Sequence, residues 1–349
     1  MLEVGPQHNI DYRQEVLTPF FNYVRSAESF YVIGGASMGK TRLLDFITKE
    51  DVQKQYLGEQ AGQIWLVRVD MTRLSIRDEA WAFFELLLSS IVLEATNHES
   101  VADLRKELVD LDARVIQSHD LLLALRFFEM AVNRLCQAKH LKLCFLFDEF
   151  DEAYRHLARE TFSQLRAVRD ANKNRVSYGI FLRNLPERLR PSPDNESFYE
   201  LLSRNMLGLR PYTKADSLQI IQQLEARRNY PLTPAQRDRV VEASGGHAGL
   251  VQAIFSILIE NPEAESKVGM PGWIEWFGRQ PVSIEECRKI WEGLASDERE
   301  GLSILAEEGY NQIPATTAKL LSAKGLLKVI NDTPSFFSPL FGLYVRSLL

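Results

Sequence analysis

The stretch that decides the fold is residues 29–47, SFYVIGGASMGKTRLLDFI. It opens with an apolar, β-prone run and closes with the apolar spacing of a helix. Between the two lies GGASMGKT, residues 34–41, which matches the pattern G-x-x-x-x-G-K-[ST] in the strand, loop and helix context that this pattern requires. The sequence therefore predicts a phosphate-binding loop at residues 34–41.

The residue types of this loop suit a phosphate. Glycines let backbone N–H groups curl around the phosphate oxygens, and the following helix directs the positive end of its dipole at them. Lys40 is expected to reach the β- and γ-phosphates of a nucleotide and so to take part in catalysis, while the Thr41 hydroxyl is expected to ligate Mg²⁺. The predicted nucleotide contacts of the loop are Gly34, Gly35, Ala36, Ser37, Met38, Gly39, Lys40, Thr41 and Arg42.

A second apolar run ends in acids, because residues 143–147, LCFLF, lead directly into Asp148 and Glu149. In phosphate-loop enzymes the first acid of such a pair contacts Mg²⁺, and the second polarises the attacking water as a general base. The alternative is an ordinary strand that ends in solvated acids. The loop upstream favours the first interpretation, which assigns Asp148 to the metal and Glu149 to catalysis.

Three further apolar runs, residues 63–70, 176–182 and 205–209, are expected to complete a sheet. Helical patterns separate them, and this alternation predicts an α/β fold with a five-stranded parallel sheet and flanking helices. A helical insertion at about residues 77–137 lies between the second and third strands. Its apolar stripe is either a surface that pairs with another helix or the inner face of helices packed on their own domain, which is the commoner arrangement.

Arg183 follows the strand of residues 176–182. Ligands of open parallel sheets bind outside the carboxyl ends of the strands. We therefore expect Arg183 to sense or stabilise the γ-phosphate, as a third catalytic residue, although it is also one of several arginines in this stretch. Asp151 and Glu152, just after the predicted metal-binding strand, are interpreted as surface charges.

Several short segments together resemble the motifs of prokaryotic STAND-type AAA+ signalling ATPases and of the related origin-recognition-like ATPases, within the ASCE division of P-loop proteins. These segments are YRQE at residues 12–15, the loop itself, FDE at 147–149, FLR at 181–183 and ASGGHAGL at 243–250. The resemblance covers nearly the whole chain.

In that family an hhGRE segment contacts the adenine side, a strand-tip arginine is the sensor, and a G-x-P element of the helical lid touches the base. The resemblance therefore implies base contacts from Gly246 and Ala248. This chain departs from the family pattern twice. Gln14 separates Arg13 from Glu15, and Ala248 stands where the family has proline.

Three parts are expected along the chain: an ATPase core at residues 1–209, a helical lid at 210–270 and a module at 283–349. The module has three helical patterns and a hairpin signal, and it resembles a winged helix. It carries seven basic residues against nine acidic ones, and its third helix offers only Lys319 and Lys324. This charge favours a regulatory or protein-contacting role over DNA binding.

The overall composition is that of an ordinary folded protein, with 45% hydrophobic and 25% charged residues among 349. Lys and Arg number 41 against 47 Asp and Glu, so no overall basic field draws the chain to nucleic acid or anionic lipid. The three cysteines are scattered, no apolar stretch reaches the ~20 residues of a membrane span, and no secretion signal is recognised. A cytoplasmic location is expected.

These features predict an ATP-binding molecular switch with slow, Mg²⁺-dependent hydrolysis, in which nucleotide state changes how lid and winged helix pack on the core. The expected cofactors are ATP or ADP and Mg²⁺, and the expected partner is a protein or effector in trans, with nucleotide-dependent oligomerisation. One alternative is a DNA-remodelling or DNA-loading AAA+ ATPase whose winged helix grips duplex. The other is a scaffold that holds nucleotide without turnover.

Overall fold

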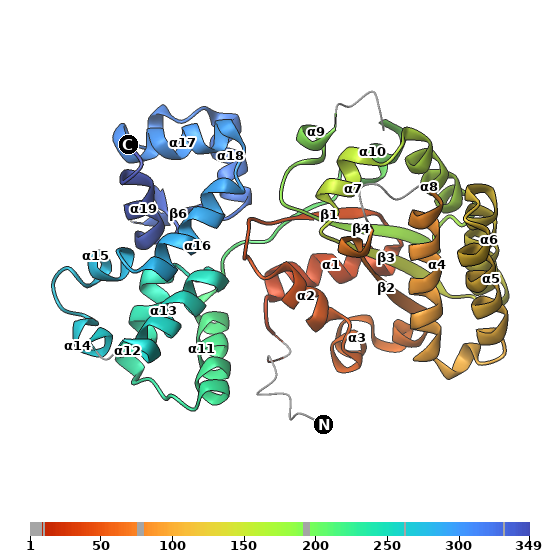
Figure 1. The fold of residues 1–349 in the computed structure, drawn as a ribbon, viewed down its shortest axis with the longest axis horizontal. Helices are drawn as coiled ribbons and strands as arrows, with labels where there is room; N and C mark the ends of the chain where they lie inside the picture. The colour runs from red at the N-terminus through yellow and green to blue at the C-terminus, as the bar shows by residue number, and fades with distance from the viewer. Residues whose placement is uncertain (1–8, 10, 75–79, 191–195, 262, 331) are drawn as a thin grey trace. The chain divides into compact units, whose positions relative to one another are not determined.

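The computed structural model describes residues 9, 11–74, 80–190, 196–261, 263–330 and 332–349 (Figure 1). The chain folds into two compact units that alternate along the sequence. We call them the sheet unit, Leu17–Ile33 with Leu43–Leu207, and the lid unit, Met1–Val16 with Gly34–Arg42 and Gly208–Leu349. The loop of residues 34–41 thus belongs to the lid unit.

The sheet has five strands in the order β2-β3-β4-β1-β5. They are β1 (Phe30–Ile33), β2 (Ile64–Asp70), β3 (Lys142–Asp148), β4 (Val176–Leu182) and β5 (Met206–Gly208). The pairs β2/β3, β3/β4 and β1/β4 are parallel, and every residue of β4 is buried, as expected where helices cover both faces. All five predicted strands are present within one or two residues, which confirms the predicted α/β fold.

Packing inside the sheet explains one glycine of β4. A Cβ built on Gly179 would lie 2.6 Å from the Phe30 ring and 2.8 Å from a Leu146 methyl group. Phe30 and Leu146 come from β1 and β3, the two neighbours of β4. The absence of a side chain at Gly179 therefore lets these neighbours fill the space over the central strand.

Helices surround the strands in the chain order of an α/β protein (Figure 1). They are α1 (Gln14–Ser26), α2 (Lys40–Ile47), α3 (Glu50–Leu57), α4 (Ala80–Thr96), α5 (Arg105–Ser118), α6 (Leu121–Asn133), α7 (Asp151–His156), α8 (Arg159–Ala171), α9 (Pro186–Leu189) and α10 (Glu196–Leu202). The predicted insertion consists of α4, α5 and α6, which pack on one another. The apolar stripe of α5 is buried within this group, so it serves internal packing rather than a free surface.

After β5 the lid unit continues with three helices, α11 (Lys214–Arg228), α12 (Pro234–Ser244) and α13 (Ala248–Glu260). Thr233 and Gln236 form a capping box at the start of α12, where a proline occupies the first turn. The helix ends at Gly245, whose φ of +58° is left-handed. A Thr-Pro start and a glycine stop are the usual local signals for a helix of this kind.

The rest of the lid unit is helical apart from one hairpin (Figure 1). Its elements are α14 (Ala264–Lys267), α15 (Trp273–Gly278), α16 (Pro281–Glu292), α17 (Ser296–Glu307), α18 (Ala315–Ala323), β6 (Leu327–Ile330), β7 (Thr333–Phe336) and α19 (Pro339–Arg346). Strands β6 and β7 pair antiparallel, which confirms the predicted hairpin. No helix among the described residues is long and apolar enough to cross a membrane.

One hydrophobic core joins the lid helices to the C-terminal elements. Leu250 of α13 is buried in the same cluster as Cys287, Leu302 and Phe341, which come from α16, α17 and α19. A polar contact crosses the same junction, because the Ser338 hydroxyl donates to the Ala243 carbonyl at 2.7 Å. The helices on either side of residues 262–281 therefore pack as one body.

Candidate functional site

The loop of residues 34–41 joins β1 to α2, and its lysine folds back over it. Lys40, the first residue of α2, is 5% exposed, and its Nζ donates to the carbonyls of Gly34 at 2.9 Å and Gly35 at 3.0 Å. Ser37 and Gly39 have positive φ, at +51° and +86°. The loop is therefore a tight, curled segment with an ammonium group held at its start.

Tyr212 lies against the far end of the loop. A Cβ on Gly39 would be 2.6 Å from the Tyr212 hydroxyl, and the φ of Gly39 is left-handed, so both sterics and backbone require glycine here. The Tyr12 hydroxyl donates to that of Tyr212 at 3.1 Å. The Arg13 guanidinium stacks over the Tyr212 ring at 4.1 Å.

Arg13 ties the N-terminal segment to the loop. Its side chain is fully buried and donates to the carbonyls of Met38 at 2.8 Å and Arg210 at 2.7 Å. Its backbone N–H, at a residue with a φ of +52°, donates to Asp216 Oδ1 at 3.3 Å. No carboxylate among the described residues forms an ion pair with Arg13, and its Nε has no hydrogen-bond partner there. The guanidinium is therefore a buried cation whose described contacts are neutral carbonyl oxygens and the rings of Tyr12 and Tyr212.

His247 connects the lid to the same loop. It is the N-cap of α13, where its Nδ1 accepts from the Leu250 N–H at 3.3 Å, so the ring proton is on Nε2. Nε2 donates to the Ala36 carbonyl at 3.0 Å. Burial lowers the pKa of His247 to about 4, and the charges of Arg13 and Lys40 act in the same direction against the opposing effect of Glu286. The imidazole is therefore neutral near neutral pH.

Helix α16 brings a carboxylate to the loop. A Cβ on Gly249 would lie 1.8 Å from Glu286 Oε1 and 2.9 Å from the Ser37 Cβ, which places Glu286, Gly249 and Ser37 together. Glu286 Oε1 is buried and has no hydrogen-bond partner among the described residues, while Oε2 is 3.6 Å from the Lys289 ammonium. An anion at the loop would therefore meet both the cations and this acid.

The two predicted base-contacting residues have structural roles in the lid. Gly246 has a φ of +80°, and a Cβ there would be 2.2 Å from the Tyr212 carbonyl oxygen. The Gly246 carbonyl accepts from the Tyr212 N–H at 2.9 Å. Ala248 is the first residue of α13 and is buried. Their contact with a base stays a prediction.

The acids lie in the sheet unit, where each faces an arginine. Asp148 is the last residue of β3 and is 4% exposed, and its Oδ2 accepts from Arg68 of β2 at 3.2 Å. The same guanidinium forms an ion pair with Asp45 of α2. Arg68 thus bridges two carboxylates and partly neutralises the predicted metal-binding acid.

Glu149 and Arg183 are brought together. The guanidinium of Arg183 donates to Glu149 Oε2 at 2.6 Å, with the two side chains 46% and 30% exposed. The structure thereby joins two residues that the sequence assigned to catalysis from separate strands. Glu149 has a φ of +52°, so its backbone is left-handed at the point where the chain leaves β3.

The sequence interpretation of Asp151 as a surface charge is wrong. Asp151 is buried, and its carboxylate accepts the backbone N–H of Arg183 at 2.9 and 3.0 Å and that of Asn184 at 3.2 Å. It therefore fixes the turn after β4 and positions Arg183. Glu152 is exposed and pairs with Arg155, which confirms its interpretation as a surface charge.

Among the described residues no cluster of three or more His, Cys, Asp or Glu side chains is arranged to hold a metal ion. Such a cluster is not needed for Mg²⁺ at a nucleotide, because the ion takes most of its ligands from phosphates and water, with one or two protein oxygens. The Thr41 hydroxyl and the Asp148 carboxylate are hard oxygen donors of this kind. Their chemistry fits the predicted ion.

Sequence reasoning placed Tyr12, Arg13 and His247 in family-like segments but did not foresee their contacts with the loop, and it missed Tyr212, Glu286 and Arg68. Arg68 is a single arginine in a strand, and Glu286 is an acid on an amphipathic helix. Neither position has a local sequence signal for a place at the site. The position of Tyr212 in the chain indicated only that it belongs to the predicted lid at residues 210–270.

No protein-family model and no curated protein matches the chain. Solved structures do match it over nearly its whole length. A Walker-type ATPase of Pyrococcus abyssi is 14% identical with a TM-score of 0.52, and the match covers 96% of this chain and 95% of that one. The ORC2 protein of Aeropyrum pernix in its ADP form is 13% identical with a TM-score of 0.56, covering 99% and 96%. These likenesses confirm the fold as a P-loop core with a helical lid.

Proposed function

We propose that this protein binds ATP at the loop of residues 34–41 and hydrolyses it with Mg²⁺. The observation that carries the proposal is Arg13, a fully buried guanidinium that donates to the Met38 carbonyl and has no carboxylate partner among the described residues. Burying a charge is costly unless an opposite charge compensates it. A phosphate on the loop would supply that charge, and the adjoining Lys40 would add a second cation to hold it.

The proposed chemistry uses residues of both motifs. Lys40 neutralises charge on the transferred phosphate, and Glu149 orients and polarises the attacking water. Thr41 and Asp148 would hold Mg²⁺, which supplies charge neutralisation on the phosphate oxygens when bound. The 2.6 Å ion pair with Arg183 occupies one oxygen of Glu149, so this acid has to exchange partners before it acts on water. We propose on this ground that basal turnover is slow.

The lid contacts support a regulatory role for nucleotide, of the kind found in STAND-type switches. His247, at the start of α13, hydrogen-bonds to Ala36, and Glu286 of α16 lies beside Ser37. Residues from the lid helices and from the C-terminal helices therefore both lie at the loop. A ligand shifts a conformational equilibrium only through such differential contacts. We propose that nucleotide state alters these contacts and so the presentation of the C-terminal winged-helix-like elements to a protein partner or to another copy of the chain.

The second candidate is a DNA-binding ATPase of the origin-recognition-like kind. The likeness to the ORC2 protein and the helix-and-hairpin layout of α16–α19 favour it. The charge opposes it, because Lys324, one of the two lysines on the third module helix, is buried in an ion pair with Glu298 at 2.6 Å. Only Lys319 of that helix is left to meet a phosphate.

One purified sample tests both candidates. Calorimetry with ATP and with ADP, each with and without Mg²⁺, measures nucleotide binding, and phosphate release measures turnover. We expect micromolar binding and turnover well below the common enzyme value of about 10 per second. Failure to bind ATP at about 1 mM would refute the proposal. A duplex dissociation constant below about 100 nM near physiological salt would favour the DNA-binding candidate, because nonspecific binding is micromolar or weaker.

A further inference from the structure

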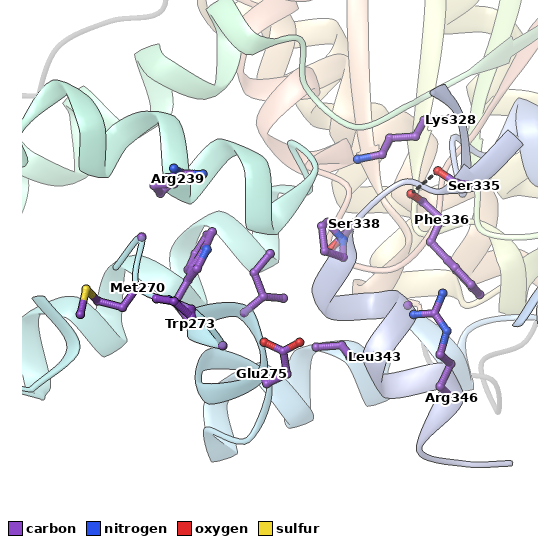
Figure 2. Close-up of a pocket in the computed structure, with 16 residues that line it drawn as sticks. Arg239, Met270, Trp273, Glu275, Lys328, Ser335, Phe336, Ser338, Leu343 and Arg346 are labelled. Atoms are coloured by element: carbon purple, nitrogen blue, oxygen red, sulfur yellow. Dashed lines mark hydrogen bonds between the residues drawn. The ribbon is translucent and has the colours of Figure 1, made fainter. Parts of the chain in front are cut away.

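The lid unit contains a hollow that no residue of the phosphate loop lines. It has a volume of about 650 Å³, within the usual range for small-molecule sites. Its walls come from α12, the segment that leads into α15, the β6–β7 hairpin and α19 (Figure 2). Four elements that are distant in sequence therefore converge on one concave surface.

One side of the pocket is cationic. Lys328 of β6 is half-buried, and its ammonium forms no hydrogen bond or ion pair with any described residue. Burial lowers the pKa of this ammonium, against the opposing effect of Glu242. Figure 2 shows its ammonium directed toward the hollow. Arg346 of α19 contacts the Phe336 ring at 5.5 Å and has no acidic partner in the described part of the chain. An anion beside Lys328 would compensate its charge.

The other cation of the lining is already engaged. Arg239 of α12 pairs with Glu242 at 2.6 Å and lies 5.9 Å over the Trp273 ring. One acid, Glu275, also lines the pocket. Lys328 and Arg346 therefore outnumber the single free acid, so the pocket favours a negative ligand in a protein whose net charge is −6.

The opposite side of the pocket is apolar. Met270, Pro271 and Trp273 line it, and Met270 is 58% exposed, so its thioether is accessible to a ligand. In Figure 2 Met270 and Trp273 lie across the hollow from Lys328 and Arg346. A thioether and an indole suit a flat ring, because sulfur and aromatic faces both pack well against one.

We propose that this pocket binds a small aromatic anion, with a planar ring against Met270 and Trp273 and a phosphate or carboxylate group at Lys328. Such a ligand would contact α12 and the α15 segment on one side and the hairpin and α19 on the other. It is separate from the ATP that we propose for the loop. It would therefore act as a second ligand of the lid unit.

Calorimetric titration of the full chain with naphthyl phosphate and with naphthoate tests the proposal. Neutral naphthol and inorganic phosphate serve as controls for the ring and the charge alone. We expect both aryl anions to bind and each control to bind at least tenfold more weakly. The stronger of the two anions identifies the preferred acidic group. No binding of either anion up to about 1 mM would overturn the proposal.

Two variants locate the binding. Lys328→Met should weaken aryl anion binding at least tenfold, whereas Lys319→Met, which removes the same charge from an exposed position outside the pocket, should leave it unchanged. Equal effects of the two would contradict the proposal. Ser335→Trp narrows the hollow without a change of charge. This variant replaces Lys328→Met as the test of the pocket if circular dichroism shows that Lys328→Met does not fold. It should also abolish binding.

The phosphate loop is the competing location for a naphthyl phosphate. Binding to the pocket should survive in Lys40→Ala. If Lys40→Ala loses binding of naphthyl phosphate and Lys328→Met keeps it, the probe binds at the loop, and the proposed pocket site is wrong. Because these titrations need no ATP turnover, their outcome is independent of whether the proposed ATPase activity is found.

Discussion

The charged residues at the loop in the lid unit and the acids in the sheet unit have different kinds of hydrogen-bond partner. At the loop, Arg13 and Lys40 donate to main-chain carbonyls, which carry no net charge. At the acids, Asp148 and Glu149 each pair with a guanidinium. Arg13 thus keeps a positive charge for an anion, whereas Asp148 and Glu149 are each partly compensated by an arginine before any ligand arrives. Binding and hydrolysis should therefore respond differently to mutation.

The largest effect is expected from Glu149→Gln. This change keeps the shape of the side chain but removes the charge that polarises water, so turnover should fall about a hundredfold while ATP affinity changes little. Phosphate release and calorimetry on the same sample measure the two quantities. Glu152→Gln, an exposed acid three residues away, is the matched control and should keep parental turnover. Parental turnover in Glu149→Gln would show that another group is the base.

The next effect concerns pH and the neutral imidazole at the loop. The folded pKa of His247 is about 4, below its ordinary value of 6.5, so the unfolded chain binds a proton first as pH falls. The contribution of neutral His247 to the free energy of unfolding is therefore complete above about pH 6.5 and is lost as the pH falls toward about 4. Between about pH 7 and about pH 5 this loss is about 2 kcal/mol. Chemical denaturation of the parent and of His247→Asn, which retains an N-cap oxygen, measures this. An identical pH dependence in both would exclude His247 as its source.

A tenfold or greater loss of ATP affinity is expected from Lys40→Ala. The ammonium that lies on the Gly34 and Gly35 carbonyls is the charge nearest the predicted phosphates, and one decade of affinity corresponds to about 1.4 kcal/mol. Lys54→Ala removes a lysine whose side chain is 66% exposed and is the control. If calorimetry gives the same dissociation constant for both variants, residues 34–41 do not bind the phosphates.

The smallest effect concerns Glu286, an acid that lies beside the loop. Glu286→Gln removes a negative charge next to Ser37 and should raise the affinity for ATP about threefold. Glu285→Gln, on the same helix but paired with Arg288 and half exposed, should not change it. Weaker binding in Glu286→Gln would mean that this carboxylate helps to hold the ligand rather than opposing it.

The sequence was sufficient for the parts whose signals are local. The five strands, the loop, the capped start of α12 and the hairpin all follow from periodicity and turn residues, and all are present. The contacts made by Arg13 could not be predicted, since its partners Met38 and Arg210 lie 25 and 197 residues away. Only the packing of the whole lid unit brings them together.

Asp151 shows the same limit in a single side chain. The local sequence around an acid that follows a strand is the same in two cases: when water surrounds the carboxylate, and when the carboxylate accepts N–H groups from distant residues. Its actual partners are 32 and 33 residues further along, at Arg183 and Asn184. Local sequence therefore predicted the position of the carboxylate relative to β3 but gave the wrong environment for it.

The core shared by α13 and the C-terminal helices has a consequence for folding. Leu250 is covered by side chains of α16, α17 and α19, so a chain cut between α15 and α16 would expose the inner face of α13 to water. Each buried leucine uncovered in this way costs about 2 kcal/mol. The lid helices and the C-terminal helices should therefore melt in a single cooperative transition, and neither half should be obtainable as a stable isolated fragment.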